Sequence, residues 1–102
     1  MANKSNSLGS VIRKIRESKG LLLRQVAAAL EVDTAYVSKL ERGEKRTSKE
    51  QLKKLSKFLE TSEEKLLELW LAEKVMTAIE GEEHGANALK IVSKRIKNNI
   101  TK

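Results

Sequence analysis

The stretch over residues 26–43 constrains the fold of this chain more than any other, because its pattern predicts two short helices joined by a tight turn. Leu23, Val26, Ala27 and Leu30 follow the i, i+3, i+4, i+7 spacing of one buried helical face. Two helices that cross at about 90 to 120° through a short turn must approach closely, and small side chains permit this. The alanines of this stretch supply such side chains.

The second helix of the pair has a predicted start, an inward face and an end. Asp33 or Thr34 can cap the start by accepting a hydrogen bond from a backbone N–H two or three residues further on. Val37 and Leu40 give the inward face, and Gly43 ends the helix as a left-handed residue would. The pattern is typical of a helix-turn-helix unit, whose second helix lies in the major groove of DNA.

The outward face of this second helix carries short or polar side chains. Near the start of a DNA-reading helix, such side chains reach base edges, while flanking polar groups hold phosphates. Lys39 can reach guanine O6 or N7, and the methyl groups of Thr34 and Ala35 can touch a thymine methyl. The alternative interpretation is an ordinary solvated helix face.

Further motifs extend this pattern along the chain, from the first predicted helix to the fifth. In order they are Ile12-Arg13-Lys14-Ile15-Arg16, Gly20-Leu21, Val26-Ala27, Val32, Val37-Ser38, Glu41-Arg42-Gly43, Leu52, Leu55, Leu59 and Leu66-Leu67. With this series, residues 8–67 resemble the Xre family of helix-turn-helix proteins, the phage-repressor-like group. The resemblance implies a five-helix domain that binds double-stranded DNA and regulates transcription.

The resemblance also implies roles for single residues. The family's base-reading positions fall on Thr34, Ala35, Tyr36 and Lys39. Its positions for backbone phosphate contacts fall on Ser38 and Arg42, and we expect further phosphate contacts from Arg24, Gln25, Lys45 and Arg46.

The start of the predicted second helix departs from the family pattern. The family often has Ser or Thr followed by a phosphate-clamping Gln there, but this chain has Leu22 and Leu23. The clamp must then come from Arg24 or Gln25, or be absent. A second departure lies before the fourth helix, where many relatives carry proline. There, Thr47 with Glu50 or Ser48 with Gln51 forms a capping box instead.

The charge of the chain is concentrated where DNA is expected to bind. Residues 1–60 contain 14 Lys and Arg against 7 Asp and Glu, whereas residues 61–102 contain 7 of each. The whole net charge of +7 therefore lies in the first part. A basic surface attracts a polyanion and makes its binding depend on salt. The alternative is a basic protein without a role in nucleic-acid binding.

The composition favours an all-α fold and offers nothing for catalysis. The chain has no proline, only 3% aromatic residues and no segment with the alternation of a strand. It has no cysteine, and a single histidine, His84, is a poor candidate for a metal site. We therefore expect no enzyme activity, metal, cofactor or small-molecule effector, and, with no signal peptide or membrane span, a cytoplasmic protein.

The C-terminal third divides into two oppositely charged segments. Residues 61–83 carry two lysines and seven glutamates, and residues 84–102 carry five basic residues and no acidic one. Thr61-Ser62-Glu63-Glu64 predicts the capped start of a long fifth helix, and the segment from Gly81 to Gly85 predicts a break. This helix and the one after the break have more apolar residues than a small domain needs, so part of their surface must face something else.

We interpret these two helices as a dimer interface. The residues expected in it are Trp70, Leu71, Val75, Ile79, Leu89 and Val92. An alternative is an intramolecular hairpin that covers one monomer. Two recognition helices about 34 Å apart read a palindrome, so dimerisation is expected of such a regulator.

The sequence thus predicts a five-helix repressor-like domain with an extended fifth helix and an additional C-terminal helix. Its parts are a disordered tail (1–7), the helix-turn-helix domain (8–67) and a dimerising extension (68–102). The predicted function is a dimeric repressor of a palindromic operator, and the compact size resembles the controllers of restriction-modification genes. The alternative function is a protein-interaction module, such as an antitoxin that binds a partner protein through its C-terminal helices.

Overall fold

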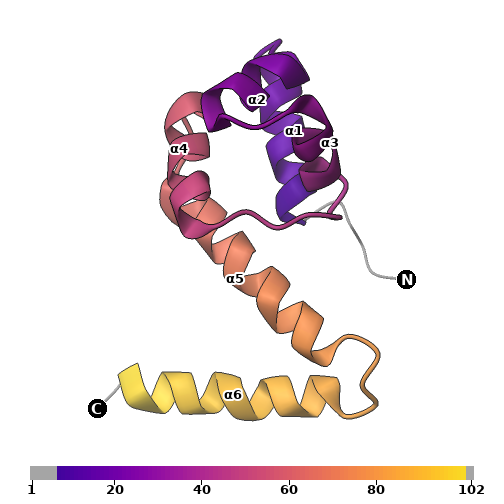
Figure 1. Cartoon of the computed structure of the whole chain (residues 1–102). Helices are drawn as coiled ribbons and strands as arrows, with labels where there is room; N and C mark the ends of the chain where they lie inside the picture. Colours follow the sequence, from indigo (N-terminus) through magenta and orange to yellow (C-terminus); the bar gives the residue numbers. More distant parts are fainter. Residues whose placement is uncertain (1–6, 101–102) are drawn as a thin grey trace.

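The computed structural model describes residues 7–100, and these form six helices without a strand (Figure 1). The helices are α1 (Leu8–Ser18), α2 (Leu23–Leu30), α3 (Thr34–Glu41), α4 (Lys49–Leu59), α5 (Glu63–Ile79) and α6 (Gly85–Ile100). The prediction of an all-α protein is confirmed. Of the predicted tail, residues 1–6 lie outside the described residues, and Ser7 caps α1 by accepting a hydrogen bond from the backbone N–H of Ser10.

The helices α1 to α5 enclose one apolar core. α2 packs on α3 and α4, α1 packs on α3 and α5, and α4 packs on α5. The side chains with the least exposure are Ile12, Val26, Val37, Leu52, Leu55, Leu59 and Leu66. The apolar faces predicted for the two helices of the central pair are therefore confirmed, since Ala27, Leu30 and Leu40 are buried as well.

The turn between α2 and α3 is short and fixed by its backbone. Glu31 adopts a left-handed conformation with φ of 58°, and the N–H of Val32 donates to the carbonyl of Ala27 at 3.0 Å. Asp33 then caps α3, because its Oδ1 accepts from the N–H of Tyr36 at 2.8 Å. Of the two caps that the sequence allowed, the structure uses Asp33.

The C-terminal end of α3 has the predicted glycine cap. Gly43 has a φ of 78°, and its N–H donates to the carbonyl of Leu40. The N–H of Glu44 donates to the carbonyl of Lys39 at 2.8 Å, which completes a Schellman motif. The chain therefore leaves α3 in one defined direction.

Serines cap the next two helices. Ser48 begins α4 by accepting from the N–H of Gln51 at 3.1 Å. Ser62 begins α5 by accepting from the N–H of Lys65, also at 3.1 Å. The caps are thus Ser48 rather than Thr47, and Ser62 within the predicted group of residues 61–64.

α5 runs out of the domain and ends far from the core (Figure 1). The chain turns in residues 80–84, within the predicted break, and α6 then runs back beneath α5. The molecule is elongated as a result, with extents of 43 × 32 × 21 Å. No helix within residues 7–100 is long and apolar enough to cross a membrane.

Candidate nucleic-acid interface

The helix α3 turns one side into the core and the opposite side to solvent. Val37 is fully buried, whereas Thr34, Ala35 and Lys39 are exposed. A shallow hollow on this open side is lined by Val32, Asp33, Ala35, Tyr36, Lys39 and Lys45. The structure therefore brings Lys45, a predicted phosphate ligand, beside the predicted base-reading residues.

Tyr36 differs from the other predicted base-reading residues, because its side chain is half-buried and its hydroxyl is engaged within the protein. The hydroxyl donates to the carbonyl oxygen of Arg46 at 2.9 Å and lies 3.0 Å from Oε1 of Gln51. It connects α3 to the segment that follows it and to α4.

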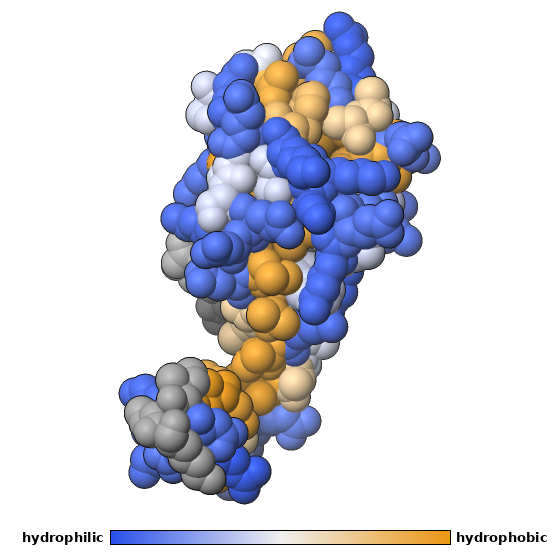
Figure 2. Space-filling view, turned by 90° about the vertical axis from the view of Figure 1, so that its left-hand side faces the viewer, coloured by the Kyte–Doolittle hydropathy of each residue, from blue (hydrophilic) through white to orange (hydrophobic). Residues whose placement is uncertain are grey.

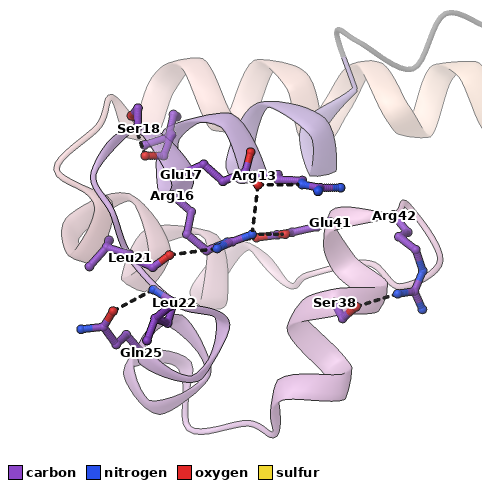
Figure 3. A network of polar contacts seen from close by, with 11 residues as sticks. Arg13, Arg16, Glu17, Ser18, Leu21, Leu22, Gln25, Ser38, Glu41 and Arg42 are labelled. Carbon is purple, nitrogen blue, oxygen red and sulfur yellow. Dashed lines mark hydrogen bonds and ion pairs between the residues drawn. The ribbon is translucent and has the colours of Figure 1, made fainter.

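Ser38 and Arg42 lie together at the end of α3 (Figure 3). The guanidinium of Arg42 donates to Oγ of Ser38 at 2.6 Å and to a carboxylate oxygen of Glu44 at 2.8 Å. The hydrogen bond to Glu44 raises the pKa of the Arg42 guanidinium above its ordinary value. The two predicted phosphate ligands are thus adjacent and exposed or half-exposed, with a carboxylate beside them.

The start of α2 lacks a polar cap of the usual kind. Leu22 occupies the N-cap position, where its side chain offers no acceptor and is 48% exposed. Oε1 of Gln25 instead accepts from the N–H of Leu22 at 2.7 Å (Figure 3). Because Oε1 of Gln25 accepts this hydrogen bond, only the amide N–H groups of Gln25 are available to donate to a phosphate. The neighbouring Arg24 is also exposed.

Arg46 points toward α5, although Lys45 next to it lines the hollow on α3. The guanidinium of Arg46 donates to the hydroxyl of Thr77 on α5. Both residues also line a hollow beside α5, so Lys45 lies between α3 and α5, whereas Arg46 lies on the α5 side.

A buried ion pair that the sequence analysis did not predict joins α1 to α3 (Figure 3). The guanidinium of Arg16 donates to the two carboxylate oxygens of Glu41 at 2.6 and 3.1 Å, and to the carbonyl of Leu21 at 2.9 Å. The side chains of Arg16 and Glu41 are only 11% and 5% exposed. Both belong to the motifs that carry the family resemblance, but residues 25 positions apart give no periodic signal. The hydrogen bonds to Glu41 raise the pKa of Arg16.

The predicted interface residues fall into two groups. Leu71, Val75, Leu89 and Val92 are between 41% and 48% exposed. Trp70 and Ile79 are half-buried, and Nε1 of Trp70 donates to the carbonyl of Thr47 at 2.8 Å. Exposed apolar side chains also include Met76, Ile91 and Ile96.

These exposed side chains lie on α5 and α6, where Figure 2 shows a stripe of apolar surface that runs along α5 and continues onto α6. The close contact between the two helices lies at their junction, where Gly85 is buried against Ile79. In this conformation, α6 does not cover the apolar stripe of α5 as an intramolecular hairpin would.

No group of three His, Cys, Asp or Glu side chains within residues 7–100 is arranged to hold a metal ion. His84 is exposed, and its Nε2 lies 3.9 Å from a carboxylate oxygen of Glu83.

Comparison with known proteins agrees with the geometry of α2 and α3. A family profile described as helix-turn-helix matches residues 12–66, more than half of the chain. The chain belongs to the Xre-like helix-turn-helix family. A comparison with curated protein sequences gives no match.

Two crystal structures of the clp gene regulator ClgR from Corynebacterium glutamicum are similar to this chain. One is 33% identical, with a TM-score of 0.58, and the match covers 72% of this chain and 95% of ClgR. The other is 31% identical, with a TM-score of 0.59, over 89% of this chain and 95% of ClgR. The predicted family is therefore confirmed by sequence and by structure.

Proposed function

We propose that this helix-turn-helix protein is a sequence-specific regulator that binds double-stranded DNA as a dimer and represses transcription from a palindromic operator. One observation carries the proposal. α3 is anchored by a buried face that includes Val37, while its opposite face offers exposed Thr34, Ala35 and Lys39 to a partner. A helix presented in this way fits the major groove.

In this proposal the DNA sequence that the protein prefers is determined by Thr34, Ala35 and Lys39. Lys39 contacts guanine, and the two short side chains contact thymine methyl groups. Contacts to phosphates fix the register of the protein on the duplex. The residues proposed for these contacts are Arg24, Gln25, Ser38, Arg42 and Lys45, which lie at the start of α2, on α3 and just after α3.

The apolar stripe of α5 and α6 supports the dimer. Leu71 and Val75 lie on α5, Leu89 and Val92 lie on α6, and all four are exposed in the single chain. Contiguous apolar surface of this kind marks an interface. A second copy that packs on the stripe buries it and brings a second recognition helix to the same DNA. The similar protein ClgR, named as a gene regulator, supports a regulatory role.

The proposal is tested by selecting binding sites from a random pool of double-stranded DNA. The expected product is a palindrome with half-sites about 10 base pairs apart, bound roughly a thousandfold more tightly than unselected DNA. Lys39→Ala should relax the preference at one position by about 1 to 3 kcal/mol. Lys57→Ala removes the same charge from α4 and should keep the preference. Equal losses on selected and unselected DNA for Lys39→Ala would remove Lys39 from the reading set.

Sedimentation tests the dimer separately. Val75→Glu should convert a dimer into a folded monomer, because it places a charge on an exposed apolar position of α5. Leu22→Glu changes an exposed apolar residue at the start of α2, outside the stripe, and should leave the dimer intact. A wild-type protein that sediments as a monomer at micromolar concentration contradicts this part of the proposal.

A second candidate is an interaction module, such as an antitoxin, whose C-terminal helices hold a different protein. The exposed Leu22 at the start of α2, where a polar clamp is usual in the family, favours it because an altered clamp suggests altered use of DNA. A small protein that co-purifies in a stoichiometric amount, together with no selected DNA sequence, would support this candidate.

A further inference from the structure

The segment between α3 and α4, residues 42–48, is basic and is held in place from two sides. It contains Arg42, Lys45 and Arg46, with Glu44 as its one acidic residue. It has no regular secondary structure apart from the turn that ends α3. Segments of this kind need contacts from neighbouring elements to take one conformation.

The first contact comes from the recognition helix. The hydroxyl of Tyr36 donates to the carbonyl of Arg46 at 2.9 Å, and Gln51 of α4 lies 3.0 Å from the same hydroxyl. A tyrosine hydroxyl that is engaged with the backbone in this way holds the segment against α3.

The other contacts come from α5. Nε1 of Trp70 donates to the carbonyl of Thr47 at 2.8 Å, and the hydroxyl of Thr77 accepts from the guanidinium of Arg46. The ammonium of Lys74 lies 4.2 Å from the centre of the Trp70 ring, a distance typical of a cation–π contact. Side chains of α5 therefore hold Arg46 and Thr47, two successive residues of the segment.

Within the segment, Lys45 is the basic residue that lines the hollow on the open side of α3. Lys45 lines the same hollow as Ala35 and Lys39. It also lines a second hollow on the side of α5, where Arg46 donates to Thr77. At the other edge of the recognition unit, Leu22 cannot bind a phosphate through its side chain. The basic segment is thus in a position to add to the phosphate contacts proposed for Arg24 and Gln25 at the start of α2.

We propose that Tyr36, Trp70 and Thr77 are positioning residues that hold residues 42–48, here called the clamp, for the phosphate contacts assigned to this segment. In this arrangement Lys45 contacts phosphate. Arg46 connects the segment to α5 and does not bind phosphate. Tyr36 holds the segment in place and does not contact a base. The inference rests on the proposed binding of double-stranded DNA.

Two variants remove the positioning contacts with little change of shape. Tyr36→Phe deletes the hydroxyl on α3, and Thr77→Val deletes the hydroxyl on the exposed part of α5. Each should raise the dissociation constant by roughly 2- to 10-fold, the usual effect of one net hydrogen bond, on selected and unselected DNA alike. The selected sequence should stay the same, because phosphate contacts carry no sequence information. Ser93→Ala, which removes an exposed hydroxyl from α6, serves as the matched control.

A double-mutant cycle with Lys45→Ala distinguishes positioning from a general loss of structure. Lys45→Ala alone should weaken binding to all sequences and reduce the salt dependence by about one phosphate contact. In that background, Tyr36→Phe and Thr77→Val should have almost no further effect, because the group that they position is gone. Losses that simply add to that of Lys45→Ala would overturn the proposal.

Two other results also overturn it. One is unchanged affinity in both hydroxyl variants, and the other is a new preferred sequence for Tyr36→Phe, which would assign Tyr36 to base reading. The proposed function fails by a different result, namely that wild-type protein selects no sequence. The clamp is then still tested on unselected DNA.

Discussion

Large apolar side chains are mostly buried in residues 8–70 and mostly exposed in residues 71–99. In the first region, Leu22 and Phe58 are the exposed large apolar residues, and the others pack into or against one core. In the second region, large apolar side chains along α5 and α6 are exposed. The first region buries its apolar side chains within a single chain, whereas the second leaves apolar surface exposed, of the kind that marks an interaction site.

The buried ion pair of the first region should give the largest effect when it is broken. Arg16→Met leaves the carboxylate of Glu41 buried without its partner, so we expect a loss of about 3 to 5 kcal/mol in the free energy of unfolding. Urea denaturation followed by circular dichroism measures it. The double variant Arg16→Met with Glu41→Leu should recover much of the loss. A single variant as stable as the wild type contradicts the assignment of this pair to the folded core.

A pair of leucine variants compares the two regions directly. Leu55→Ala removes a fully buried side chain and should lower the free energy of unfolding by about 2 to 5 kcal/mol at any protein concentration. Leu89→Ala removes a side chain that is 43% exposed. In dilute protein it should change stability by no more than about 0.5 kcal/mol, and it should weaken self-association instead. Equal losses of stability in dilute protein would mean that the two regions fold as one unit.

Two glycines allow the same comparison at close helix contacts. A Cβ on Gly9 would lie 2.4 Å from the carbonyl oxygen of Leu40 and 2.6 Å from that of Glu41, so Gly9→Ala must push α1 away from α3. We expect a loss of about 1 to 3 kcal/mol.

A Cβ on Gly85 would meet the carbonyl oxygen of Ile79 at 2.9 Å, at the junction of α5 and α6. Gly85→Ala should therefore alter the angle between these helices and leave the melting of the core unchanged. Thermal denaturation of dilute protein distinguishes the two variants, and a core that melts equally early in both contradicts the separation.

The helix cap of α3 should give the smallest effect. Asp33→Ala removes the acceptor for the N–H of Tyr36, which lowers stability by about 1 kcal/mol. Asp33→Ser keeps an acceptor and should stay close to the wild type. The measurement is the midpoint of urea denaturation, and a loss in Asp33→Ser as large as that in Asp33→Ala would argue against the cap.

The local features of the fold could be predicted from the sequence because they depend on neighbouring residues. The buried faces of α2 and α3 follow from helical periodicity, and the end of α3 follows from Gly43. Where two adjacent residues were both able to cap a helix, as with Thr47 and Ser48, the sequence alone did not decide. Thr47 is buried in the structure, and the cap falls to Ser48.

The features that could not be predicted join residues that are far apart in the chain. Arg16 and Glu41 meet because α1 packs on α3, and neither residue breaks the pattern of its own helix. The hydroxyl of Tyr36 belongs to a residue that we placed among the base readers, yet its partners lie 10 and 15 residues away. Such contacts depend on how the helices pack together, and the periodicity of apolar residues along the sequence does not determine this.

Because α5 is one uninterrupted helix from the core to the exposed stripe, it fixes both the distance and the rotation between them. The helix has 17 residues without glycine or proline, a length of about 25 Å. One residue inserted after Trp70 would turn the stripe by about 100° around the helix axis relative to α3. In the proposed dimer, such a turn would rotate one recognition helix out of step with the periodic grooves of the duplex. The number of residues between the core and the apolar stripe would therefore set the separation of the two half-sites in the proposed dimer.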